Sequence, residues 1–83
     1  MLVIDIFSGI GGFSIAAKWI GWETIILCEI DPFCRNVLKH HFPDAYLHDD
    51  IKTLTYETIN NKLTEKKGSL WRNDDIILVG GFP

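Results

Sequence analysis

A glycine-rich segment, Gly9–Gly12, follows an apolar run directly and could receive a negatively charged ligand. Glycine lets the backbone turn sharply and approach a ligand closely, and the start of a following helix offers unpaired N–H groups. The dinucleotide-binding fingerprint needs glycine or alanine at its third position, where this chain has Ser14. The match is therefore incomplete, and a plain turn remains the alternative interpretation.

Acidic residues follow the next two apolar runs. Glu29 lies about 20 positions after the first glycine, where a carboxylate can accept hydrogen bonds from ribose hydroxyls. Asp31 precedes Pro32 and is interpreted as a helix N-cap. Asp50 could accept a hydrogen bond from an exocyclic amine or cap a short turn at residues 52–54, whereas Asp49 is expected to be solvated. For Glu29, a solvated carboxylate at a helix start is the alternative.

These carboxylates indicate the charge of the predicted ligand. If Asp5, Glu29, Asp49 and Asp50 surround one crevice, its field is negative and only the glycine turn can receive an anion. A pyrophosphate fits such a crevice poorly. A molecule with one carboxylate, an amine, a sulfonium and a ribose fits it better. The charge pattern therefore favours S-adenosylmethionine as the ligand. A nicotinamide dinucleotide is the less favoured alternative.

The elements that must position these groups alternate between strands and helices. Short apolar runs predict strands, and apolar residues at helical spacing between them predict helices, one of them with Phe33 and Val37 on one face. This alternation is typical of an α/β fold, here the N-terminal half of a doubly wound, Rossmann-like, mostly parallel sheet with strand order 3-2-1-4. The glycine turn should then lie beside the last residues of the chain. The predicted strands are 2–7, 24–28, 45–47 and 75–79, and the predicted helices run from Phe13 to Ile20, from Pro32 onward and over 56–67.

Four segments in order resemble the motifs of the DNA cytosine C5 methyltransferases. Residues Asp5–Phe13 resemble the first motif, Glu29–Asp31 the second, Asp50-Ile51 the Gly-Asp-Ile third motif, and Gly80–Pro83 the opening of the fourth. Asp49 stands where the family usually has glycine. The resemblance covers the whole chain and implies the fold of S-adenosylmethionine-dependent methyltransferases.

The resemblance also implies an activity and a set of contacts. Family members transfer a methyl group from S-adenosylmethionine to C5 of a cytosine flipped out of DNA. Phe7 and Ile30 would pack on the adenine, Glu29 would bind the ribose, Asp50 would accept from the adenine amine, and Pro83 would lie near the reactive end. The complete set implied to contact the cofactor is Asp5, Phe7, Ser8, Gly9, Ile10, Gly11, Gly12, Glu29, Ile30, Asp50, Ile51 and Pro83.

The catalytic nucleophile is expected outside these residues. The family's cysteine directly follows the Phe-Pro pair, and the sequence ends at Pro83. Cys28 and Cys34 are expected to be packing residues with no disulfide or metal role, and His48 is expected to be an ordinary loop residue. Residues 1–83 are thus interpreted as the cofactor-binding half of a catalytic domain. It would lack a target recognition domain and be inactive alone.

Composition limits the partners. A net charge of −3 disfavours a DNA-binding surface within these 83 residues, so DNA is expected to bind through the remainder of the enzyme. No apolar run approaches the roughly 20 residues of a membrane span, and no leader precedes the first strand, so a cytoplasmic location is expected. The alternative function is a non-catalytic remnant or interaction module that pairs through the strand at 76–79, with itself or with a complementing chain. Three tryptophans, Trp19, Trp22 and Trp71, are expected to be core and cover residues.

Overall fold

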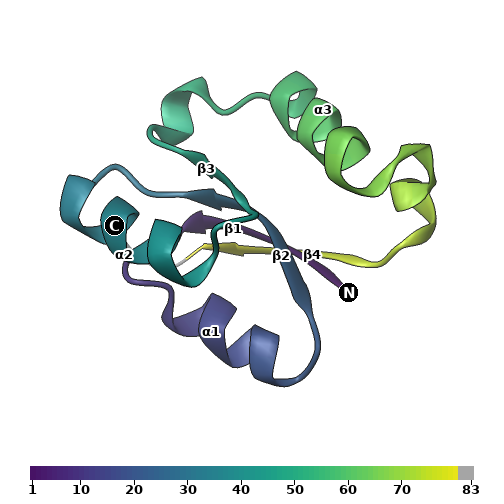
Figure 1. The fold of residues 1–83 in the computed structure, drawn as a ribbon. Coiled ribbons are helices and arrows are strands. Elements are labelled where there is room, and N and C mark those ends of the chain that lie inside the picture. Colours follow the sequence, from purple (N-terminus) through teal and green to yellow (C-terminus); the bar gives the residue numbers. More distant parts are fainter. Residues whose placement is uncertain (81–83) are drawn as a thin grey trace.

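The structure is a computed structural model that describes residues 1–80, without the side chain of Leu70. Strands and helices alternate along the chain (Figure 1). The elements are β1 (Leu2–Phe7), α1 (Gly12–Trp19), β2 (Glu23–Cys28), α2 (Pro32–His41), β3 (Tyr46–His48), the 3₁₀ turn η1 (Ile51–Thr53), α3 (Tyr56–Lys67), the 3₁₀ turn η2 (Ser69–Asn73) and β4 (Ile76–Gly80).

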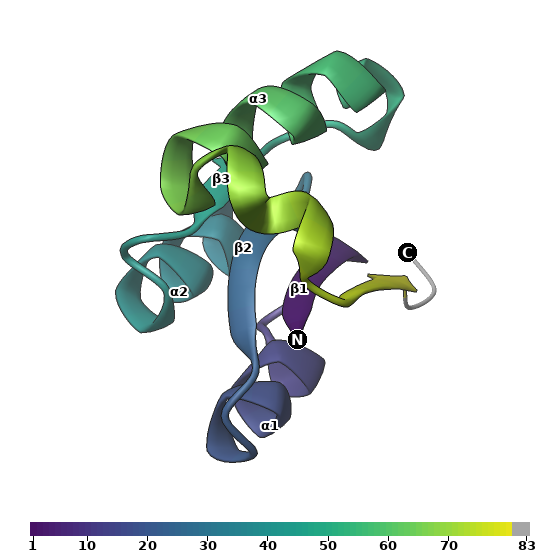
Figure 2. The ribbon, with the colours of Figure 1, turned by 90° about the vertical axis from the view of Figure 1, so that its right-hand side faces the viewer.

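The strands form one sheet in the order β3-β2-β1-β4, and every neighbouring pair is parallel. Helices α1 and α2 lie on one face of the sheet and α3 lies on the other, as Figures 1 and 2 show from two sides. Both the α/β class and the strand order agree with the sequence prediction. Because all strands are parallel, their carboxyl ends meet at one edge of the sheet.

Strand β1 is central and pairs with two strands that are distant from each other in the sequence. Leu2 pairs with Glu23 of β2 and with Ile76 of β4. At the other end Phe7 pairs with Gly80, so the glycine-rich turn after β1 lies beside the end of β4. The predicted meeting of these segments is confirmed up to residue 80, and residues 81–83, Pro83 among them, lie outside the described part.

The larger hydrophobic core lies between the sheet and α3. Leu2 and Ile4 of β1 and Ile26 of β2 pack with Leu63 of α3 and Trp71 of η2. Leu63 is 1% exposed, as expected for the apolar side of an amphipathic helix. This packing holds the crossover from β3 to β4 against the sheet.

Helix α2 begins at its predicted cap but buries a different face. Asp31 Oδ1 accepts hydrogen bonds from the backbone N–H groups of Phe33 at 2.8 Å and Cys34 at 3.2 Å. Phe33 was expected on the apolar face, but it is 71% exposed, and Leu38 is the side chain that becomes fully buried. The helical spacing suits both faces, and packing against the glycine turn selects the one that includes Leu38.

The prediction that the tryptophans are core and cover residues is wrong for Trp19. Trp71 is 9% exposed, and its indole N–H donates to the Thr64 hydroxyl at 3.0 Å. Trp22 is partly buried. Trp19, the last residue of α1, is 82% exposed, because the buried side of that helix carries Ser14 and Ala17 instead.

Strand β4 is an edge strand in the described residues. Ile76 and Leu78 are 39% and 63% exposed, so one face of this strand is apolar and open. No helix in residues 1–80 is long and apolar enough to cross a membrane.

Candidate functional site

The turn after β1 takes a backbone path that depends on two glycines. Gly9 has a φ of +56° and Gly11 a φ of +93°, both in the left-handed region. The turn closes through hydrogen bonds from the Gly11 N–H to the Ser8 carbonyl and from the Ser8 hydroxyl to the Asp5 carbonyl, each 2.9 Å. A Cβ at Gly11 would lie 2.9 Å from Leu38 Cδ2. Glycine at this position therefore serves both the conformation and the packing against α2.

Glu29 joins this turn to the end of β2. Its Oε1 accepts a hydrogen bond from the Gly9 N–H at 2.7 Å, and its Oε2 accepts one from the Asp31 N–H at 3.0 Å. Each oxygen keeps a further lone pair. The carboxylate is thus held in place by two backbone groups and can still accept a ligand hydroxyl.

Arg35 of α2 shapes the loop between Glu29 and the helix. Its Nη1 donates to the Ile30 carbonyl at 2.7 Å and also contacts the Glu29 carbonyl at 3.4 Å. The Ile30 side chain is 69% exposed, which is unusual for isoleucine beside a cavity. It offers an apolar surface at the carboxyl edge of the sheet.

Asp50 begins the 3₁₀ turn after β3. Its Oδ1 accepts a hydrogen bond from the Lys52 N–H at 2.9 Å, which supports the capping interpretation, although the turn begins one residue earlier than expected. The Glu29 N–H donates to the His48 carbonyl at 3.0 Å, so the ends of β2 and β3 stay together. Asp50 Oδ2 accepts no hydrogen bond from the part of the chain described.

Asp5 lies beneath the turn and away from the crevice. It is 2% exposed, and its Oδ2 accepts a hydrogen bond from the Ser14 hydroxyl of α1 at 3.0 Å. Burial raises the pKa of the Asp5 carboxyl, because the charged form loses hydration. Asp49, which was also placed at the crevice, does not line it.

The carboxyl edge of the sheet contains a cavity of about 400 Å³. Cavities of this size accommodate small-molecule ligands, for which about 300–1,000 Å³ is usual. Six of the sequence-predicted residues line it: Phe7, Gly9, Glu29, Ile30, Asp50 and Ile51. Five further residues that were not predicted as contacts also line it: Ile6, Cys28, Asp31, Cys34 and Lys52. Asp5, Ser8, Ile10, Gly11 and Gly12 do not line it, and Pro83 is not described.

The lining combines apolar walls with carboxylates. Glu29, Asp31 and Asp50 contribute negative charge, and Lys52 is the one basic residue among the lining side chains. Phe7 and Ile51 contribute apolar surface. This arrangement can accept hydrogen bonds from hydroxyl and amino groups and can pack on a flat ring. It favours a ligand without a large negative charge.

The two cysteines at this cavity are poor nucleophiles. Cys28 is 1% exposed, and burial, followed by the charges of Asp50 and Glu29, raises the pKa of its thiol to about 11. Partial burial and Asp31 also raise the pKa of Cys34. Both cysteines are free, and residues 1–80 contain no group of His, Cys, Asp or Glu side chains able to hold a metal ion.

Sequence reasoning treated His48 as an ordinary loop residue, but it makes side-chain contacts on both sides. Its Nδ1 lies 2.8 Å from the Tyr46 hydroxyl and its Nε2 lies 2.7 Å from the Thr53 hydroxyl. The signal in the sequence is the spacing of two, because Tyr46 and His48 point to the same side of a strand. These residues lie next to the turn that carries Asp50.

Comparison with known proteins identifies relatives over the whole chain. The sequence profile of the family C-5 cytosine-specific DNA methylase matches residues 1–83. The chain is 41% identical over 54 residues to the Type II methyltransferase M2.BsuMI of Bacillus subtilis (strain 168), covering 65% of this chain and 14% of that protein. It is 30% identical over 81 residues to the Type II methyltransferase M1.HphI of Haemophilus parahaemolyticus, covering 96% of this chain and 20% of that protein.

A solved structure supports the same grouping. It is named as a DNA modification methyltransferase encoded within a prophage of E. coli, and it superposes on 100% of this chain with a TM-score of 0.77 at 30% identity. This chain covers 22% of the solved one. The 83 residues therefore span about a fifth or less of each of these three proteins.

Proposed function

Because the chain belongs to the C-5 cytosine-specific DNA methylase family, we propose that it forms the S-adenosylmethionine-binding part of a DNA cytosine C5 methyltransferase. The observation that carries this proposal is the cavity at the carboxyl edge of the sheet. It brings the Gly9 turn, Glu29 and Asp50 together, although they come from three different strand ends. Ligands of open α/β sheets bind at this edge.

The adenine would occupy the apolar part of the cavity. Phe7, Ile30 and Ile51 are the side chains that can pack on its faces. The exposure of Ile30 supports this assignment, since covering it with a ring would remove apolar surface from water. Asp50 would accept a hydrogen bond from the adenine amine, most readily through Oδ2, since Oδ1 already accepts from the Lys52 N–H.

The ribose and the methionine portion would lie toward β1. Glu29 would accept hydrogen bonds from the ribose hydroxyls with the lone pairs that the two backbone N–H groups leave free. The backbone of Gly9–Gly12 and the start of α1 would hold the methionine portion, with Pro83 near the reactive end. Asp5 and Ser8 would support this turn from beneath.

The cofactor, when bound, supplies a methyl group on a sulfonium. The described residues would bind and orient the cofactor and exclude water from the adenine. None of them is proposed to react. A cysteine thiolate is the nucleophile of the family, and the raised pKa values of Cys28 and Cys34 make both unsuitable. We assign that role to a cysteine beyond Pro83, and DNA recognition to the remainder of the enzyme.

A second candidate function is favoured by the edge strand β4. This strand, with Ile76 and Leu78 exposed, could pair with a strand of a complementing chain or of a second copy. Size-exclusion chromatography at several concentrations tests this reading. Elution at the monomer volume throughout would count against self-association.

Calorimetric titration with S-adenosylmethionine tests the main proposal, with the chain alone and with the remainder of the enzyme added. Glu29→Gln is expected to weaken binding at least tenfold, because a charge-assisted acceptor for the ribose is lost. Asp49→Asn removes the same charge at an exposed position outside the cavity and should leave binding unchanged. Absence of binding heat from folded wild-type protein, in both forms, would refute the proposal.

A further inference from the structure

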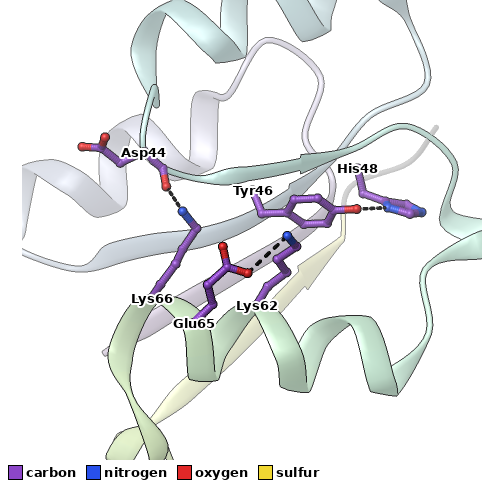
Figure 3. A network of polar contacts seen from close by, with 6 residues as sticks. All are labelled: Asp44, Tyr46, His48, Lys62, Glu65 and Lys66. Carbon is purple, nitrogen blue, oxygen red and sulfur yellow. Dashed lines mark hydrogen bonds and ion pairs between the residues drawn. The ribbon is translucent and has the colours of Figure 1, made fainter.

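Three side chains form a hydrogen-bonded relay behind the turn that carries Asp50. The Tyr46 hydroxyl lies 2.8 Å from His48 Nδ1, and His48 Nε2 lies 2.7 Å from Thr53 Oγ1. The Thr53 hydroxyl donates in turn to the Asp50 carbonyl at 2.9 Å. Figure 3 shows the first of these contacts, with the Tyr46 hydroxyl pointing at the His48 ring. The relay thus runs from β3 into η1.

The proton positions in the relay follow from its last member. Thr53 has one hydroxyl proton, which it donates to the Asp50 carbonyl, so Thr53 Oγ1 must accept from His48 Nε2–H. With one proton on Nε2, the neutral ring accepts at Nδ1, and the Tyr46 hydroxyl donates to it. For a neutral His48 ring, only this arrangement of protons satisfies every contact.

Both ends of the relay are attached to other elements. Lys62 of α3 places its Nζ 4.7 Å from the centre of the Tyr46 ring and is paired with Glu65 at 3.4 Å (Figure 3). At the other end the Thr53 N–H also donates to the Asp50 carbonyl, at 3.0 Å. This carbonyl therefore receives two hydrogen bonds from one residue. His48 contacts the Thr53 hydroxyl that makes one of these two bonds.

We infer that His48 is a positioning residue that orients Asp50 toward the adenine amine, an inference that rests on the proposed function. Asp50 caps η1, and the turn holds it at two points, its carbonyl through Thr53 and its carboxylate through the Lys52 N–H. Loss of the Thr53 contact would therefore loosen the turn that sets the direction of the carboxylate. Asp50 Oδ1 is already held by the Lys52 N–H, which leaves Oδ2 as the freer acceptor for the ligand. A displacement of about 1 Å at such an acceptor can cost a large factor in recognition.

The first experiment needs no ligand. Long-range ¹H–¹⁵N spectra should show the His48 ring with its proton on Nε2, and the Thr53 amide should exchange slowly with solvent. His48→Leu is expected to speed that exchange about tenfold, since the Thr53 hydroxyl loses its donor. His48→Gln, whose carboxamide can donate near the Nε2 position, should restore slow exchange. A ring protonated on Nδ1, or unchanged exchange in His48→Leu, would overturn the inference.

The second experiment measures the ratio of affinities for S-adenosylmethionine and its inosine analogue, which lacks the adenine amine. The ratio should fall five- to tenfold in His48→Leu, the worth of about one hydrogen bond, and recover in His48→Gln. His40→Leu replaces an exposed histidine of α2 and should leave the ratio unchanged. An unchanged ratio in His48→Leu, with a lower unfolding midpoint, would show a purely structural role and overturn the inference.

The two experiments separate this inference from the proposed function. If wild-type protein binds neither compound, the proposed function fails, and the role of His48 in adenine recognition fails with it. The ring proton and the Thr53 exchange then still report whether His48 orders the turn. If wild-type protein binds both compounds with equal affinity, the cofactor assignment survives, but Asp50 does not read the amine and the inference is overturned.

Discussion

Replacing Gly11 with alanine should destabilise the chain more than the same change at either neighbouring glycine. Gly11 has a φ of +93°, and a Cβ there would lie 2.9 Å from Leu38 Cδ2 and 3.4 Å from Phe42 Cε2. Leu38 is fully buried and cannot move freely. Gly9 has a φ of +56° but open space around it, and Gly12 has neither a positive φ nor a close neighbour. The three positions therefore separate conformational strain from steric overlap.

The magnitudes follow from these two terms. A left-handed conformation costs a non-glycine residue about 1–2 kcal/mol, and overpacking a buried site costs about 1–3 kcal/mol. Gly11→Ala carries both and should lose about 2–5 kcal/mol, whereas Gly9→Ala carries only the first. Gly12→Ala should stay within about 0.5 kcal/mol of wild type. A chain of 83 residues has a free energy of unfolding of roughly 4–12 kcal/mol, so the loss at Gly11 is a large share.

Urea unfolding followed by circular dichroism measures this series. With a slope of about 1 kcal/mol per M, Gly11→Ala should lower the midpoint by about 2 M or more. Adding Leu38→Val to Gly11→Ala removes an overlapping methyl group, so the double variant should lose less than the sum of the single changes. If Gly11→Ala lowers the midpoint no more than Gly9→Ala, the overlap with Leu38 has no energetic effect and the reasoning is refuted.

Three further predictions concern side chains at the site. Asp31→Ala should lower the free energy of unfolding by about 1 kcal/mol through loss of the α2 cap, and Asp31→Ser should retain most of it, both measured in urea. Burial raises the pKa of Asp5 above its ordinary value near 3.8, so its contribution to stability is lost as pH rises through the folded-state pKa. Asp5→Asn, which can still accept from Ser14, should therefore gain stability relative to wild type between about pH 4 and neutral pH, and a pH-independent difference would contradict this. Iodoacetamide labelling, followed by mass spectrometry, should be slow at neutral pH for both Cys28 and Cys34 and faster at higher pH. Cys28 should need a pH near its pKa of about 11. Rapid labelling of Cys28 at pH 7 would count against its burial.

Most of the fold could be predicted because its signals are local. The apolar run at Leu2–Phe7, the Asp31-Pro32 cap and the amphipathic spacing of Ile59 and Leu63 each specify an element without reference to the rest of the chain. The face that α2 buries could not be predicted in this way. It depends on which side meets the turn, and Leu38 rather than Phe33 faces Gly11.

The candidate site was only partly predictable for the same reason. Glu29 and Asp50 follow strands directly, so their place at the carboxyl edge of the sheet follows from parallel topology. Asp5 also lies in β1, but two residues before the end of the strand, where its side chain is buried and accepts a hydrogen bond from Ser14 instead of lining the cavity. The contacts of His48 could not be predicted from the sequence, because its contact with Thr53 depends on the path of the 3₁₀ turn.

The strand order also determines when each strand can find its neighbours while the chain is being synthesised. β1 can pair with β2 as soon as Glu23 leaves the ribosome, but its other neighbour requires Ile76. Until then the central strand has one open edge, and the buried residues Leu2 and Ile4 lack the cover that α3 and η2 provide. β1 can therefore pair with a foreign strand until residues 76–80 have emerged. The arrival of β4 closes this period.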